Sequence, residues 1–234
     1  LWPLLRLPLI LSLVAGSVYP LLLMSHFDWR AALGMVLAFW VFLTTVRSLL
    51  EQARGRSLLK VAPAFWGMSL GHIGIAVFIV GITLTSIYST EKDLRLEPGQ
   101  TYELGGYDFT FNGVAVTQGA NYEASRGDVT VTREGQDIAS LHPEKRIYLV
   151  QKMPMTEAAI DAGLTRDLFV ALGEPLGSDG AWSVRVYHKP YIRWIWLGAL
   201  IMSLGGILAA SDRRYRMMSR RRRKAEAATA GAVA

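Results

Sequence analysis

The sequence predicts a membrane α-helical protein with four transmembrane helices and an antiparallel β-rich domain inserted between the third and the fourth. Two observations lead to this fold class. Of the 234 residues, 51% are hydrophobic, and many gather in stretches long enough to cross a bilayer core, which takes about 20 helical residues. Between the third and fourth stretches, residues 89–189 have the composition of a soluble domain, with short runs of alternating apolar and polar residues.

Each apolar stretch is expected to form one helix across the bilayer. The third stretch has no charged residue, and Pro63 stands where a first helical turn tolerates proline. The first stretch does not have the pattern of a signal peptide, because its apolar core is long and no small-residue cleavage site follows. The expected spans cover residues 4–24, 29–50, 64–88 and 191–210.

Basic residues predict the orientation of the spans, because short cytoplasmic loops carry an excess of lysine and arginine. The loop between the first two spans has only Arg30, which Asp28 balances. The next loop and the C-terminal tail are both basic, through Arg47, Arg54, Arg56, Lys60, Arg213, Arg214, Arg216, Arg220, Arg221, Arg222, Arg223 and Lys224. We therefore expect both termini in the cytoplasm of a bacterium, the protein in its inner membrane and the inserted domain in the periplasm. These arginines predict contact with the lipid bilayer and no nucleic-acid partner.

The inserted domain is expected to be antiparallel β structure. Tyr107, Phe109 and Phe111 alternate with polar residues, as in a half-buried strand, and further alternating runs surround Val129 and Val184. Turns are expected at residues 105–106, 135–136 and 177–180. One short helix is expected to begin at Thr156 and to end before Gly163.

Several kinds of chemistry find no support in the sequence. There is no cysteine, so disulfides and thiolate ligands are excluded. We find no nucleotide-binding glycine loop, no metal-spaced carboxylate cluster and no nucleophile motif. Asp161 and Asp167 are therefore expected to be surface or capping residues.

His72 is the most informative residue, because it lies inside an uncharged span, about 12 Å from its start at 1.5 Å per residue. Ionisable side chains at such depth usually face a cavity, a partner or a cofactor. Gly67 and Gly71 share one face of the same helix, and that face could admit a neighbouring helix or a flat cofactor. Three interpretations stay open from the residues alone: a hydrogen bond between helices, ligation of a haem or other metal by His72, and a proton relay.

The remaining histidines do not pair with His72. His26 lies between the first two spans, and His142 and His188 belong to the inserted domain. A haem held by two histidines would therefore need its second ligand from outside this chain.

A segment of the third span resembles the late transmembrane histidine segment of the CcmF family, the haem lyase subunits of bacterial cytochrome c maturation. The residues that carry this resemblance are Gly71-His72-Ile73-Gly74-Ile75-Ala76-Val77 and Ile79-Val80-Gly81-Ile82. Further blocks follow in the same order as in the family: 89–93, 97–99, 144–146, 154–160, 166–174, 190, 194–198, 205–206 and 212–214. The first two spans match the family in character only.

The resemblance implies a role for this chain in c-type cytochrome biogenesis. His72 would be one axial ligand of a b-type haem that reduces the incoming haem iron. The chaperone CcmE would deliver that incoming haem, which is then joined to apocytochrome c through thioether bonds. CcmH/CcmI-type subunits are expected as further partners, and the related NrfE branch leaves the substrate cytochrome open.

The family's tryptophan-rich periplasmic segment, its two periplasmic histidines and its earlier transmembrane histidine are not in this chain. We therefore expect a fragment or the product of a split gene, a haem lyase component that is inactive alone. A transporter or permease subunit and a non-catalytic docking scaffold are the alternatives. Arg193, at the outer end of the fourth span, is either a propionate partner or an interfacial anchor. The expected domains are residues 1–63, 64–88 with His72, 89–189, 190–210 and 211–234.

Overall fold

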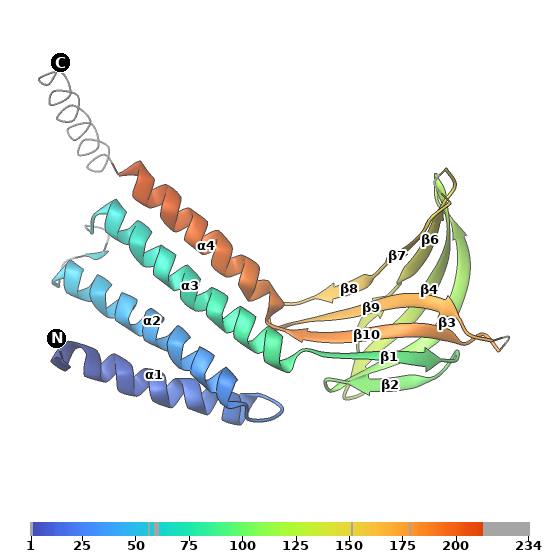
Figure 1. The fold of residues 1–234 in the computed structure, drawn as a ribbon, viewed down its shortest axis with the longest axis horizontal. Coiled ribbons are helices and arrows are strands. Elements are labelled where there is room, and N and C mark those ends of the chain that lie inside the picture. The colour runs from blue at the N-terminus through green and yellow to red at the C-terminus, as the bar shows by residue number, and fades with distance from the viewer. Residues whose placement is uncertain (1, 56, 59–60, 151, 178, 213–234) are drawn as a thin grey trace, which may run out of the picture. The chain divides into compact units, whose positions relative to one another are not determined.

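A computed structural model describes residues 2–55, 57–58, 61–150, 152–177 and 179–212 (Figure 1). Arg56, Lys60 and the tail 213–234, on which much of the expected orientation depends, lie outside the described residues. The chain divides into two compact units, Leu1–Thr83 with Trp194–Ala234, and Leu84–Arg193. Each unit is considered by itself.

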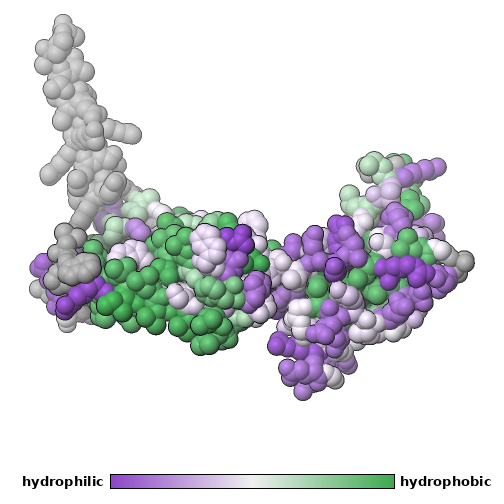
Figure 2. All heavy atoms as spheres, turned by 60° about the horizontal axis from the view of Figure 1, so that its bottom comes forward, coloured by the Kyte–Doolittle hydropathy of each residue, from purple (hydrophilic) through white to green (hydrophobic). Residues whose placement is uncertain are grey.

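Among the described residues, the first unit is built from four long apolar helices, α1 to α4. All four are long and apolar enough to cross a membrane, and their surface is largely hydrophobic (Figure 2). The protein is therefore a multi-pass membrane protein, as the sequence predicts. The helices cover α1 Trp2–Leu23, α2 Trp29–Ala53, α3 Pro63–Tyr88 and α4 Ile192–Ser211.

Two aspartates cap helix starts in this unit. Asp28 precedes α2, accepts a 2.7 Å hydrogen bond from the Arg30 backbone N–H, and pairs with the Arg30 guanidinium at 2.8 Å. The hydrogen bond from the Arg30 side chain is the main reason why the pKa of Asp28 falls to about 2. At the other end of the bundle, the buried carboxylate of Asp212 accepts a 3.1 Å hydrogen bond from the Ala64 N–H, in the first turn of α3.

Helices α3 and α4 meet along a line of glycines, which we call the glycine seam: Gly67, Gly74 and Gly81 of α3 with Gly198 and Gly205 of α4. The glycines recur every seven residues, so they stay on one side of each helix. A Cβ atom placed on Gly198 would lie 2.7 Å from the Gly74 carbonyl oxygen, closer than real Cβ contacts come. The two backbones therefore pack at a distance that only glycine allows.

The second unit holds the β domain, Thr90–Pro190, in which two antiparallel sheets lie on a common core (Figure 1). One sheet has the order β1-β10-β9-β8 and the other β2-β3-β4-β6-β7, with β5 paired to β4. The strands are β1 Thr90–Leu96, β2 Thr101–Leu104, β3 Tyr107–Gln118, β4 Tyr122–Arg133, β5 Gln136–Leu141, β6 Glu144–Tyr148, β7 Pro154–Glu157, β8 Ala159–Ala162, β9 Arg166–Pro175 and β10 Trp182–Pro190.

The core of the β domain comes from the alternating residues that the sequence singles out. Phe111 is 0% exposed, and its neighbours on β3 and β4 are similarly buried. The opposite sheet contributes Leu168, Val170, Leu172, Val184 and Val186. Leu104 pairs with Tyr107 across the expected Gly105-Gly106 turn, where both glycines have positive φ. The predicted fold class is confirmed.

The helix expected from Thr156 is wrong, because this segment forms strands β7 and β8. Its alanine and glutamate residues favour a helix when considered alone. In the fold, however, Thr156 pairs with Lys145 of β6 and Ile160 pairs with Phe169 of β9. The pairing with β6 and β9 outweighs the helix propensity of this segment, which is worth only ~0.5 kcal/mol per residue.

Candidate functional site around His72

His72 lies on a face of α3 that no other described element covers. At about 100° per residue, the glycine seam occupies the opposite side of the helix. The buried Ser69 and Ala76 mark a second face, at 0% and 4% exposure. The third face, which we call the open stripe, consists of His72, Met68, Ile75 and Ile82, and the last three are 46%, 41% and 42% exposed. The imidazole is thus presented outward from the four-helix unit.

A hydrogen bond fixes the orientation of the imidazole. His72 Nδ1 lies 2.9 Å from the Met68 carbonyl oxygen, one turn earlier in α3. A carbonyl can only accept, so Nδ1–H is the donor, and in the neutral ring Nε2 keeps its lone pair. Histidines that ligate metals commonly donate their other ring N–H to a backbone carbonyl in this way. The arrangement therefore leaves the lone pair of Nε2 unused on the open stripe.

The two glycines near His72 have different surroundings. A Cβ on Gly67 would lie 2.5 Å from the Ala209 backbone nitrogen, so Gly67 serves the packing of α3 on α4. A Cβ on Gly71 would meet nothing within 4 Å. The expected interhelical role thus fits Gly67, whereas the side of α3 at Gly71 has room for a further group beside His72.

His72 has no second ligand nearby in the described part of the chain. His26 is exposed in the loop between α1 and α2, 3.1 Å from the Ser25 hydroxyl. Among the described residues, no group of three or more His, Cys, Asp or Glu side chains could hold a metal ion. Within the described residues, the fold therefore brings no other possible metal ligand close to His72.

The helical unit also contains an apolar cavity of about 240 Å³. Its lining includes no histidine and consists of Tyr19, Met35, Ala38, Phe39, Phe42, Ala76, Val77, Val80 and Trp194. The cavity is smaller than the range of about 300–1,000 Å³ that is typical of cofactor sites. It touches α3 on the face of Ala76, so it is separate from the open stripe.

A second group of interacting side chains lies in the β domain, at the end where the chain joins α3 and α4. Tyr107 stacks on His188 with ring centroids 5.9 Å apart, and its hydroxyl accepts 3.2 Å hydrogen bonds from Arg133 and Arg166. Gly105, at φ +63°, packs against the imidazole, where a Cβ would lie 2.7 Å from the ring. Desolvation, then the charges of Arg166 and Arg133, lower the pKa of His188.

The lowered pKa of His188 makes the β domain less stable in acid. Below pH 6.5 the unfolded state binds more protons at His188 than the folded state, so this contribution to stability is complete above pH 6.5 and declines as the pH falls. We expect the free energy of unfolding, measured with urea by circular dichroism, to fall between pH 7.5 and pH 5.5. His188→Phe keeps a ring against Tyr107 and should reduce that fall.

A histidine outside the domain provides the control. His26 lies in the loop between α1 and α2, and His26→Gln should leave the pH dependence of the β domain as in the wild type. Identical pH dependence in wild type and His188→Phe would contradict the role of His188.

Asp161, Asp167 and Arg193, which the sequence singled out, form hydrogen bonds or ion pairs within the protein. Asp161 pairs with the Arg166 guanidinium. Asp167 accepts hydrogen bonds from the Gly163 N–H and from Arg193 Nε, both at 3.1 Å. The predicted surface or capping role fits both aspartates. Arg193 connects the first turn of α4 to β9, which favours an anchoring role over binding of a propionate.

Sequence reasoning missed the group around Tyr107 as a unit. The alternation of side chains along a strand did contain a signal. Tyr107 lies two residues before Phe109, and His188 lies two residues after Val186, so each belongs to the inward face of its strand. The pairing of the strands that brings these two faces together is a long-range property of the fold.

The fold and the site define a class: a multi-pass membrane protein with a β-sandwich inserted between two apolar helices, the first of which carries an outward-facing histidine. Residues 87–190 match the family model described as the CcmF C-terminal beta-sandwich. The chain belongs to the CcmF family of cytochrome c-type biogenesis proteins, which confirms the resemblance noted in the sequence.

Relatives in several bacteria support this membership. CcmF of Pseudomonas aeruginosa is 51% identical over 207 residues, which are 87% of this chain and 31% of the relative. CcmF of Escherichia coli is 42% identical over 214 residues, covering 91% and 32%. NrfE of Haemophilus influenzae is 32% identical over 184 residues, covering 79% and 28%. The chain thus spans about a third of the length of these relatives.

A solved structure shares the fold. The cytochrome c haem lyase CcmF superposes with a TM-score of 0.72 at 20% sequence identity, over 87% of this chain and 34% of that one. At this identity the likeness concerns the fold alone.

Proposed function

We propose that this chain is the C-terminal membrane part of a cytochrome c haem lyase and that His72 is an axial ligand of a b-type haem in the bilayer. The observation that carries the proposal is the 2.9 Å hydrogen bond from His72 Nδ1–H to the Met68 carbonyl, which leaves Nε2 free to ligate iron. An imidazole within a span is costly unless it has such a role.

The residues around His72 fit a haem in three respects. The imidazole belongs to the open stripe, Gly71 leaves room beside it, and Met68 and Ile75 offer apolar contact to a macrocycle. When bound, a b-type haem supplies a one-electron redox centre. His72 would hold the iron at a fixed depth in the span, and the second axial ligand would come from outside this chain.

The β domain would lie in the periplasm and the protein in the bacterial inner membrane. The Asp28–Arg30 pair leaves the α1–α2 loop without net charge, whereas Arg54 directly follows α2, and Arg47 pairs with Glu51 in the last turns of that helix. Haem delivered by CcmE and apocytochrome c would meet on the periplasmic side, with CcmH/CcmI-type subunits as further partners. The names of the relatives support this assignment to c-type cytochrome biogenesis.

Replacement of His72 tests the ligand assignment. Purified from membranes together with the part that supplies the second axial ligand, the protein should show the Soret and α bands of a b-type haem, and His72→Ala should lose them or shift them to those of a five-coordinate iron. Imidazole added to His72→Gly should restore the six-coordinate spectrum, because it replaces the missing ligand atom. The same variants should lower the amount of haem-stained c-type cytochrome in the cell.

His26→Ala is the matched control, because it removes the other histidine of the helical unit, and its spectrum should match the wild type. A b-type spectrum that is unchanged in His72→Ala would show that His72 is not the ligand. A wild-type protein without haem would overturn the proposal as a whole.

A further inference from the structure

The apolar cavity of the helical unit lies toward one end of the four helices. The start of α2 and the end of α3 are side by side there, since a Cβ on Gly34 would lie 2.7 Å from Thr83 Cγ2. The end of α3 and the start of α4 are likewise adjacent, because a Cβ on Gly81 would lie 2.6 Å from the Ile195 backbone nitrogen. The residues that line the cavity come from all four helices, between this end and the middle of the unit.

The cavity extends along the helices through the depth of one leaflet. Trp194 lies two residues after the start of α4, whereas Phe42 lies thirteen residues after the start of α2. At about 1.5 Å per residue, the lining therefore runs from about 3 Å to about 20 Å below these helix ends. Half of a hydrocarbon core is about 15 Å thick. A volume of about 240 Å³ over such a length makes the cavity a narrow channel.

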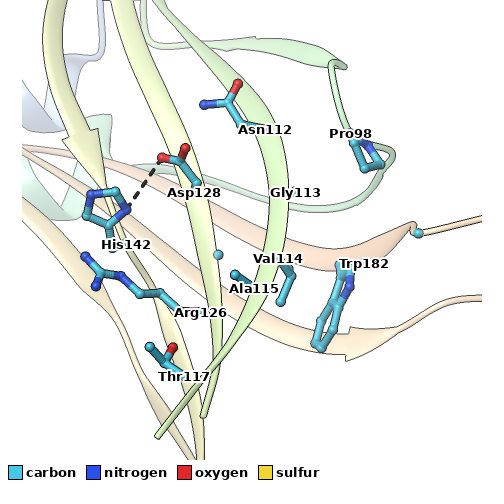
Figure 3. A pocket seen from close by; sticks show the side chains of 12 residues that line it. Pro98, Asn112, Gly113, Val114, Ala115, Thr117, Arg126, Asp128, His142 and Trp182 are labelled. Atoms are coloured by element: carbon cyan, nitrogen blue, oxygen red, sulfur yellow. Dashed lines mark ion pairs between the residues drawn. The ribbon is translucent and has the colours of Figure 1, made fainter.

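The lining of this channel has the polarity of lipid tails. Its floor is buried and consists of Met35, Ala38 and Ala76. Phe42 at its rim is exposed, so the channel opens on the side of the helical unit, which faces acyl chains in a membrane. The pocket of about 690 Å³ in the β domain is different, because charged side chains line it and Asp128 lies 3.5 Å from His142 there (Figure 3). Apolar walls offer water no hydrogen bonds, so the channel suits a hydrocarbon chain.

We infer that this channel binds one acyl chain of a phospholipid. The chain enters from the helix ends, where Tyr19 and Trp194 belong to the lining, and such side chains lie at the level of the lipid headgroups. The narrow channel admits a flexible chain and excludes a broad planar ring system. The bound chain fills the space between the four helices and stabilises their packing. This site is separate from the open stripe of His72 and does not depend on the proposed haem ligation.

Native mass spectrometry of the whole chain tests the inference. The protein is purified in a steroid-based detergent, whose rigid rings do not fit the channel, and is then given palmitoyl-oleoyl phosphatidylethanolamine. We expect the wild type to retain one phospholipid. Ala76→Phe places a ring in the channel and should reduce the lipid-bound fraction at least about tenfold. The same lipid should raise the Tm of the wild type by at least about 3 °C and leave that of Ala76→Phe unchanged.

Three controls separate a bound chain from general contact with lipid. Leu204→Phe adds a ring to the exposed surface of α4, outside the lining, and should retain the lipid like the wild type. Val80→Phe narrows the channel from a half-buried position and repeats the test if Ala76→Phe does not fold. Diphytanoyl phosphatidylethanolamine has the same headgroup but methyl branches along its chains, and it should not be retained. Equal retention of straight and branched chains, full retention by the two filled variants, or an isoprenoid quinone in place of the phospholipid would overturn the inference.

Discussion

Gly205→Ala is expected to separate α3 from α4. The added methyl carbon would lie 2.6 Å from the Gly67 carbonyl oxygen and 2.7 Å from the Gly71 nitrogen. These are backbone atoms, so no side-chain rotation relieves the contact, and the helices must move apart. Overpacking usually costs about 1–3 kcal/mol, and we expect the upper end, about 3 kcal/mol. This corresponds to a fall in Tm of about 6–12 °C in a chain of this size, measured by circular dichroism in detergent.

Gly206 provides the control for this prediction, one residue further along the same helix. A Cβ there would meet nothing within 4 Å. Gly206→Ala should therefore keep or raise the Tm, since alanine favours a helix over glycine by about 1 kcal/mol. If the two variants melt at the same temperature, the glycine seam does not determine how α3 packs on α4.

Phe111→Ala is expected to open the β domain. The ring is 0% exposed between the two sheets, and removal of a buried phenylalanine ring costs about 3–5 kcal/mol. Domains are stable by only about 5–15 kcal/mol, so much of the stability would be lost. When cleavage is slow compared with reclosing, proteolysis follows the population of the open form. The rate of proteolysis in the β domain should thus rise by about two to four orders of magnitude.

Phe169 is the matched phenylalanine on the outer face of β9. Its ring is partly exposed and contacts the edge of Tyr187 at a centroid distance of 4.8 Å. An aromatic pair of this kind contributes about 0.5–1.5 kcal/mol, so Phe169→Ala should speed proteolysis by about tenfold or less. A Phe111→Ala protein as resistant as Phe169→Ala would contradict the position of the core.

The sequence predicts those parts of the fold in which a local pattern and the final environment agree. A long uncharged run such as 64–88 forms a helix in a bilayer, because the helix bonds every backbone N–H and C=O group within the segment. The alternation at Tyr107, Phe109 and Phe111 predicts which face of β3 is buried. The segment from Thr156 fails for the opposite reason, since its composition favours a helix and its ladder partners lie in β6 and β9.

The candidate site shows the same division. The depth of His72 can be counted along the sequence, and so can the helical turn that separates it from Met68. The face of α3 that remains uncovered depends on where α2 and α4 pack, which the sequence alone does not determine.

The hydrogen bond from Ala64 to Asp212 has a consequence for the order in which the protein is made. The two residues are 148 positions apart, so the start of α3 is capped by the end of α4. A ribosome completes α3 and then the whole β domain before it reaches Asp212. Until then, the Ala64 N–H lacks its carboxylate acceptor and the glycines of α3 lack their contacts with α4. The packing of α3 is therefore completed only by α4, after the β domain has been synthesised.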